Sequence, residues 1–169
     1  PAEAAARLGR MLAALAPRGP DGQGVHLEPL AALGHRRLAV LDAAGGAQPM
    51  KDPSGRYVLI YNGEIYNHLA LRRELAHPFR TRSDGETLLA ALIAWGPAAL
   101  DRLDGMFAFA WWNRESRRLL LARDHAGIKP LFYATGPGSR GVCFASQYDV
   151  VANGPGGVPA IDPAAASAS

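Results

Sequence analysis

Residues 57–67 read YVLIYNGEIYN, and they join five strand-forming residues directly to an amide, a glycine and a carboxylate. The apolar run at residues 57–61 predicts a β-strand that ends at Asn62. Gly63 has no Cβ, so its backbone N–H can come close to a ligand, and the Asn62 side chain offers a second donor beside it. Two fixed donors side by side suit a carbonyl oxygen that becomes an oxyanion. Asn-Gly is also the preferred dipeptide of a β-hairpin turn, so these residues alone leave a turn and a site equally open.

The size and composition of the chain predict one globular domain with its own core, because its 169 residues are 49% hydrophobic. No apolar run approaches the roughly 18 residues that cross a bilayer, and residues 1–16 carry charged side chains instead of a signal-peptide core. We therefore expect a soluble, cytoplasmic domain that does not bind membranes.

Charge and metal-ligand spacing exclude two further classes of function. The net charge is +3, but the basic residues are scattered, without the basic stripe and interleaved aromatics that nucleic acid requires. Cys143 is the only cysteine, and the five histidines lie far apart. We predict neither an internal disulfide nor a metal site.

Apolar spacing and turn residues predict the other elements. Helices are expected at residues 2–16, 68–75 and 87–93, and a short one from Gly96-Pro97 to residue 103; Ser83 and Glu86 form a capping box before the third. Two short apolar segments lie at residues 32–33 and 38–41. Four apolar runs predict an antiparallel meander, with the first covered on both faces: residues 106–112, 119–123, 131–133 and 142–145. Residues 153–169 have linker composition, so we expect the domain to occupy residues 1–152.

Two charged residues are candidates for holding an amino acid. Arg37, in GHRRL at residues 34–38, can grip a carboxylate with two parallel hydrogen bonds, and Asp84 can accept hydrogen bonds from an ammonium group. Together they would hold a free α-amino acid. Taken singly, Arg37 is better explained by a surface salt bridge and Asp84 by a charge at a helix start.

Seven motifs follow one another with regular order and spacing: RGPDG at 18–22, GHRRLAVLD at 34–42, QP at 48–49, YNGEIYN at 61–67, TRSDGE at 81–86, GMFAFAWW at 105–112 and ARDHAGIKPLFY at 122–133. This set resembles the glutaminase domain of glutamine-dependent asparagine synthetases. The resemblance implies a class II, N-terminal-nucleophile glutamine amidotransferase. Its fold class would be α+β, a four-layer αββα sandwich in which two antiparallel sheets lie between helices.

The resemblance also implies a chemistry and the residues that perform it. In the family, an N-terminal cysteine attacks the glutamine side-chain amide with its own α-amino group as base, and the thioester is hydrolysed to glutamate. Asn62 and the Gly63 N–H would be the oxyanion donors. Arg37 would hold the α-carboxylate of glutamine.

Three further residues would complete the glutamine pocket by the same resemblance. Asp84 and Glu64 would receive the ammonium and polar groups of glutamine, and the main chain around Val40 would line the pocket. The charged turn at residues 123–129 is explained equally by a contact with an ammonia-accepting domain and by a salt-bridged turn.

The chain departs from the family at its beginning. It opens at Pro1, in a helix that in the family follows the first strand, so the N-terminal cysteine and that strand are not among these residues. Cys143 cannot replace the nucleophile, because it lies in a predicted strand and has no free α-amino group; a buried, inert thiol is expected. Either the first residues are missing from the chain as given, or the protein has lost them with its activity. The complete glutamine pocket favours the first explanation.

The expected partner is an ammonia-accepting synthetase domain or subunit that makes L-asparagine. Nothing in residues 153–169 resembles its pyrophosphate-binding loop, so we expect ATP and Mg only in that domain and no cofactor in this one. The alternative function is a non-catalytic, structural or ligand-sensing module of a lactam- or macrolactam-forming synthetase. A mature N-terminal cysteine separates the two. The sequence leaves the oligomeric state open, with a homodimer among the options.

Overall fold

A computed structural model describes residues 2–37, 47–135 and 141–152 of the chain. The chain forms two compact units, residues 1–130 and residues 131–169. The smaller unit contains an antiparallel hairpin of β7 (Phe132–Thr135) and β8 (Val142–Ala145), followed by the short helix α4 (Tyr148–Ala152).

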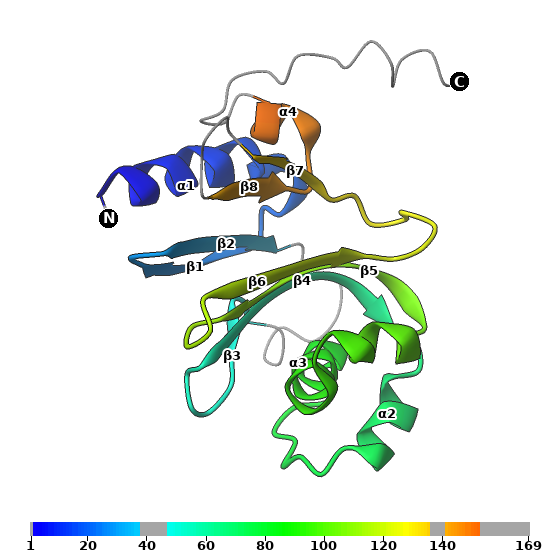
Figure 1. The fold of residues 1–169 in the computed structure, drawn as a ribbon. Coiled ribbons are helices and arrows are strands. Elements are labelled where there is room, and N and C mark those ends of the chain that lie inside the picture. Colours follow the sequence, from blue (N-terminus) through cyan, green and yellow to red (C-terminus); the bar gives the residue numbers. More distant parts are fainter. Residues whose placement is uncertain (1, 38–46, 136–140, 153–169) are drawn as a thin grey trace. The chain divides into compact units, whose positions relative to one another are not determined.

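The larger unit contains two antiparallel sheets with helices on their outer faces (Figure 1). One sheet pairs β1 (Gly22–Glu28) with β2 (Ala31–Arg37), and α1 (Ala2–Ala14) covers it. The other has the order β3 (Met50–Lys51), β4 (Tyr57–Ile65), β5 (Gly105–Asn113) and β6 (Arg118–Arg123). The helices α2 (His68–Glu74) and α3 (Asp84–Trp95) cover its outer face, and two 3₁₀ helices complete the unit, Ala16–Arg18 and Gly96–Arg102. The predicted α+β class and the sandwich of antiparallel sheets are confirmed.

The main core lies between α3 and the four-stranded sheet. Leu59, Tyr61 and Ile65 of β4 alternate along one face of the strand, and they pack with Leu88 and Leu92 of α3. All five are buried, and each fully buried leucine or isoleucine contributes about 1.5–3 kcal/mol relative to an exposed one. The odd-numbered residues of β4 therefore face the helices, and the even-numbered ones face the opposite way.

The second face of the four-stranded sheet receives the β1–β2 sheet. Glu28 at the end of β1 accepts hydrogen bonds from the Trp112 indole N–H and, at 2.6 Å, from Arg114 Nε. Val58 of β4 is fully buried on this side. On the other side of the β1–β2 sheet, Leu8 and Leu12 of α1 lie so close to Gly34 that a Cβ there would meet them at about 3 Å. These contacts fix the order of the layers.

Several predicted elements were wrong in extent. The strand predicted at residues 57–61 continues to Ile65, and Asn62, Gly63 and Glu64 pair with Ala108, Phe107 and Met106 of β5. The hairpin-turn alternative for Asn-Gly is therefore wrong. The strands β1 and β3 and the helix α4 were not predicted. The four apolar runs do not form one meander, because β5–β6 and β7–β8 belong to different sheets in the described residues. The segment predicted at residues 38–41 lies outside those residues.

Other predictions were confirmed. The helices at residues 2–16 and 68–75 form with slightly earlier ends, and the proline-started helix follows Trp95. Residues 107–110 of β5 are all buried, as expected for a strand covered on both faces. Ser83 is the N-cap of α3 and accepts a hydrogen bond from Gly85 N–H at 3.1 Å. The capping box itself does not form, because Glu86 binds elsewhere.

Candidate functional site

The candidate site lies along the edge of β4 that faces away from β5. In an antiparallel sheet, successive residues direct their N–H and C=O groups to opposite neighbours. The Tyr57 carbonyl accepts the Asp52 N–H on the β3 side at 3.3 Å, and the Arg56 carbonyl accepts the Arg114 N–H on the β5 side at 3.0 Å. The odd-numbered residues of β4 therefore present their main-chain polar groups to this side, and the even-numbered ones bond to β5. Beyond Leu59, the outward-facing groups belong to Tyr61, Gly63 and Ile65.

Tyr61 is paired by a side chain instead of a strand. The Gln48 amide donates from Nε2 to the Tyr61 carbonyl at 2.7 Å and accepts the Tyr61 N–H on Oε1 at 2.6 Å. His35 of β2 also hydrogen-bonds to the Tyr61 main chain. Both main-chain groups of Tyr61 are thereby satisfied.

Ile65 is paired by Asp84, the first residue of α3. One carboxylate oxygen accepts the Ile65 N–H at 2.9 Å and the Tyr61 hydroxyl at 2.6 Å, and the other accepts the Gly85 N–H at 2.9 Å. Burial raises the pKa of the Tyr61 hydroxyl, and the adjacent Asp84 charge raises it further, so Tyr61 stays protonated and donates. Asp84 thus joins the start of α3 to the end of β4.

Gly63 lies between these two capped positions. Its N–H points to the same edge as those of Tyr61 and Ile65, as the alternation requires. A Cβ at Gly63 would lie 2.2 Å from the Met106 carbonyl oxygen, and φ is +157°. The glycine is therefore required by the close approach of β5. The sequence had suggested only the approach of a ligand as the reason for glycine.

The two adjacent arginines at the end of β2 lie on opposite faces of their sheet. Arg36 Nε donates to the Leu12 carbonyl of α1 at 2.9 Å. Arg37 shares the other face with His35, which contacts β4. Burial lowers the pKa of His35, and the charge of Arg37 lowers it further. Of the two arginines, Arg37 is therefore the one on the face of β2 that is turned to the four-stranded sheet; its role as a carboxylate ligand stays a prediction.

Asn62 and Glu64 are exposed and lie on the even-numbered face of β4, which is directed to the β1–β2 layer. Arg37 lies on the face of β2 that is turned to the four-stranded sheet, as does His35. Asn62, Gly63 and Glu64 are neighbours on β4. That Arg37 forms one site with them stays a prediction. Asp84 borders the same edge from α3, with its carboxylate already bound to three protein donors.

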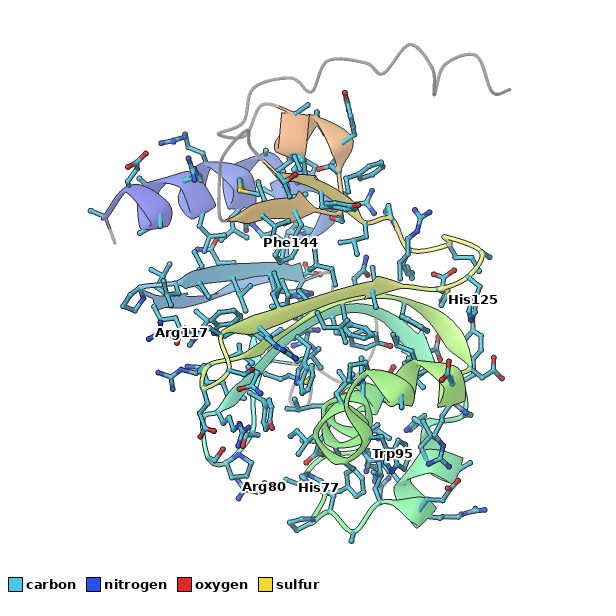
Figure 2. The ribbon with its side chains drawn as sticks, viewed as in Figure 1. His77, Arg80, Trp95, Arg117, His125 and Phe144 are labelled. Carbon is cyan, nitrogen blue, oxygen red and sulfur yellow. The ribbon has the colours of Figure 1, made fainter. Side chains whose placement is uncertain are left out.

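The segment before Asp84 is held by a polar network. Glu86 accepts hydrogen bonds from the N–H groups of Arg80 and Thr81, at 2.8 and 2.7 Å, and from the Thr81 hydroxyl at 2.7 Å. Arg72 donates to the Thr81 and Ser83 carbonyls, each at 2.7 Å. Figure 2 shows His77 and Arg80 together on this connection, and His77 lies 3.9 Å from Glu86. Burial opposes ionisation of Glu86, but these hydrogen bonds and the charge of Arg72 outweigh it and lower its pKa.

The remaining predicted residues are placed as follows. Val40 lies outside the described residues. Cys143 lies in β8 as expected, but it is half-buried and not fully buried. The turn after β6 is held by main-chain donors: the Asp124 carboxylate accepts the N–H groups of Phe107, Ile128 and Lys129 at 2.9–3.1 Å. The hydrogen bond from the Lys129 N–H is the largest cause of the lowered pKa of Asp124.

Two properties concern only the part of the chain that the structure describes. There, no three His, Cys, Asp or Glu side chains gather as metal ligands, and the expected absence of a metal stays a prediction. No helix of that part is both long and apolar enough to cross a membrane.

The model of the glutamine amidotransferase domain family matches residues 1–168. The chain belongs to this family. A putative glutamine-hydrolysing asparagine synthetase of Mycobacterium tuberculosis is 44% identical over 154 residues, covering 83% of this chain and 24% of that protein.

Two further relatives are also glutamine-hydrolysing asparagine synthetases. Asparagine synthetase 3 of Bacillus subtilis is 46% identical over 129 residues, covering 73% of this chain and 21% of that protein. Asparagine synthetase B of Escherichia coli is 47% identical over 117 residues, covering 68% and 21%. The chain thus spans about a quarter or less of the length of these relatives.

A solved structure confirms the amidotransferase fold. It is the glutamine phosphoribosylpyrophosphate amidotransferase of Bacillus subtilis, with a TM-score of 0.53 and 24% identity, covering 67% of this chain and 26% of that one. Sequence reasoning found the amidotransferase resemblance, and the Asn62-Gly63 donors stay a prediction. It missed the roles of Gln48 and Tyr61 in the β4 edge, because a Gln-Pro dipeptide and a strand tyrosine have no pattern that indicates main-chain or carboxylate partners.

Proposed function

We propose that this amidotransferase domain hydrolyses the side-chain amide of glutamine to glutamate and ammonia. The observation that supports the proposal is the direction of the Gly63 N–H, which the strand alternation turns to the edge of β4 away from β5, with Asn62 beside it on the same strand. The two groups can donate hydrogen bonds to one carbonyl oxygen. Because the chain belongs to the glutamine amidotransferase family, we assign this oxygen to the side-chain amide of glutamine.

In this proposal, the nucleophile is an N-terminal cysteine of the protein that contains the domain, outside residues 1–169. Its thiolate attacks the amide carbon, and negative charge develops on the carbonyl oxygen, where Gly63 and Asn62 donate. The C–N bond breaks as the nitrogen takes a proton from the cysteine α-ammonium group and leaves as ammonia. Water then hydrolyses the thioester to glutamate and frees the thiol. One such donor accounts for about 10²–10³ in turnover.

The amino-acid end of glutamine is assigned to the charged residues around the edge. Arg37 holds the α-carboxylate with its guanidinium fork, and the main chain around Val40 lines the pocket. Glu64 and Asp84 receive the ammonium group. Asp84 has room for this contact, since a carboxylate offers about four acceptor sites and the protein donates three hydrogen bonds to it.

The fate of the ammonia follows from the relatives. We propose that it passes to an ATP-dependent domain or subunit of the asparagine-synthetase type, where ATP and Mg act, and that it yields L-asparagine. The domain itself, which we end at residue 152, requires no cofactor. We place the protein in the cytoplasm without nucleic-acid or membrane partners.

The test uses the full-length protein purified from its native source. We expect N-terminal sequencing to give cysteine first, and the protein to release glutamate from glutamine. Asn62→Ala should lower kcat about 100-fold with little change in KM, because an oxyanion donor acts mainly in the transition state. A mature protein that begins with another residue and releases no glutamate would instead be the non-catalytic module. Unchanged kcat in Asn62→Ala would remove Asn62 from the mechanism.

A further inference from the structure

The side chain of Gln48 occupies the place of a strand residue. The β3–β4 register pairs Lys51 with Val58 and Met50 with Leu59, so residue 48 lies opposite Tyr61. In a regular antiparallel ladder, the main-chain N–H and C=O of residue 48 would form the hydrogen bonds to Tyr61. Instead, the side-chain amide makes both hydrogen bonds to Tyr61, at 2.6 and 2.7 Å.

The main chain of Gln48 is directed to the other sheet. Its carbonyl oxygen lies only 1.7 Å from where a Cβ on Gly24 of β1 would be, so that glycine makes room for it. Gln48 is therefore held from two sides, by its carbonyl against β1 and by its amide against β4.

Gln48 and Asp84 fix the main chain of β4 on either side of Gly63. The next outward-facing N–H along β4 belongs to Gly63, two residues and about 7 Å beyond Tyr61. The one after it, Ile65 N–H, is taken by Asp84 at 2.9 Å. Gly63 thus lies between two fixed main-chain positions, one set by Gln48 and the other by Asp84.

We propose that Gln48 is a positioning residue for glutamine hydrolysis, which aligns the Gly63 N–H with the amide oxygen of the substrate. Gln48 does not touch the substrate; its two hydrogen bonds fix the main chain of Tyr61, two residues before Gly63. This inference rests on the proposed function. A loss of alignment by about 1 Å costs up to 10²-fold in rate, so the effect belongs in kcat.

The experiment compares variants of the full-length protein with its native N-terminus. Gln48→Ala removes both hydrogen bonds, and Gln48→Met removes them but keeps most of the side-chain volume. Asp52→Ala is the matched control, because the Asp52 carboxylate accepts the Tyr57 N–H at 2.7 Å on the same edge, four residues before Tyr61. Thermal unfolding shows which variants are folded, and kcat and KM for glutamine are measured on those.

Both Gln48 variants should lose about 10- to 100-fold in kcat with KM within about 3-fold of the parent, and Asp52→Ala should keep the parent kcat. If Gln48→Ala does not fold, the kcat of Gln48→Met tests the positioning role. Parent kcat in a folded Gln48→Met, or an equal loss in Asp52→Ala, overturns the positioning role alone. A parent protein that releases no glutamate overturns the proposed function, and this role falls with it.

Discussion

Replacing Gly63 by alanine is the perturbation whose cost the structure defines most clearly. The new Cβ would lie 2.2 Å from the Met106 carbonyl oxygen and 2.7 Å from Phe107 Cα. Both are main-chain atoms of β5, so no flexible side chain can move aside. To reach even 3.0 Å from the oxygen, the two strands must separate by roughly 0.8 Å at the centre of their pairing.

The expected loss of stability combines two costs. Overpacking of this kind costs about 1–3 kcal/mol, and a side chain at a backbone angle that favours glycine adds about 1–3 kcal/mol. We expect Gly63→Ala to lower the free energy of unfolding by about 3 kcal/mol in total. Part of the glutaminase activity should be lost as well, because the Gly63 N–H moves with the strand.

Urea unfolding, with the midpoint and slope fitted for parent and variant, measures this loss. Gly22→Ala in β1 is the matched control, because its Cβ would meet nothing closer than the Arg37 Cβ at 3.9 Å. If Gly63→Ala lowers the free energy of unfolding by less than about 1 kcal/mol, or by no more than Gly22→Ala does, the close approach of β5 is not the reason for glycine at residue 63.

Three further predictions follow from the side-chain contacts. Arg37→Ala should raise KM for glutamine at least 10-fold. Arg36→Ala should leave KM unchanged and lower the unfolding temperature, because it loses the hydrogen bond to Leu12 of α1. Equal KM values in the two variants would contradict the role of Arg37 as the carboxylate ligand. Tyr61→Phe removes the hydroxyl donor to Asp84 and should cost about 2 kcal/mol in urea unfolding, and a cost near zero would show that this bond does not stabilise the fold. The pKa of Glu86 is lowered in the folded state, so its stabilisation is present above the ordinary glutamate pKa of 4.5 and is lost as pH falls through the lower folded pKa. Thermal unfolding between pH 5 and 2.5 should thus fall more steeply in the parent than in Glu86→Gln, and parallel curves would contradict the shift.

The sequence contained the signal for the full length of β4, but the strand was predicted to end too early. Asn62 and Glu64 look like the end of a strand because they are polar, yet they lie on the even-numbered face that is exposed at this end. Tyr61 and Ile65 continue the buried odd-numbered face, with Gly63 between them. The period of two was therefore present, and the return of an apolar residue at Ile65 was the signal that the strand continues.

Other elements were hidden because distant contacts define them. The strand β1 begins with two glycines among polar residues, and Gly24 is explained only by the Gln48 carbonyl against it. At α3, the pattern of Ser83 and Glu86 correctly predicted the N-cap. It could not predict that Glu86 would bind the N–H groups of Arg80 and Thr81 rather than that of Ser83.

Only the fold shows where the predicted site residues lie relative to the strands. Arg36 and Arg37 are equivalent as carboxylate ligands in the sequence, and only the alternation of β2 places them on opposite faces. Asp84 was predicted as an acceptor for an ammonium group, with a charge at a helix start as the alternative. Its contacts with Tyr61 and Ile65 show that it also holds α3 to β4.

The central claim is that the amide oxygen of glutamine binds at the β4 edge. A crystal structure of the full-length protein, with its nucleophilic cysteine replaced by alanine and glutamine bound, tests this directly. The account predicts the side-chain carbonyl oxygen within about 2.7–3.2 Å of both the Gly63 nitrogen and the Asn62 side-chain nitrogen. A glutamine whose amide oxygen lies away from Gly63, or which binds at another face of the domain, would contradict it.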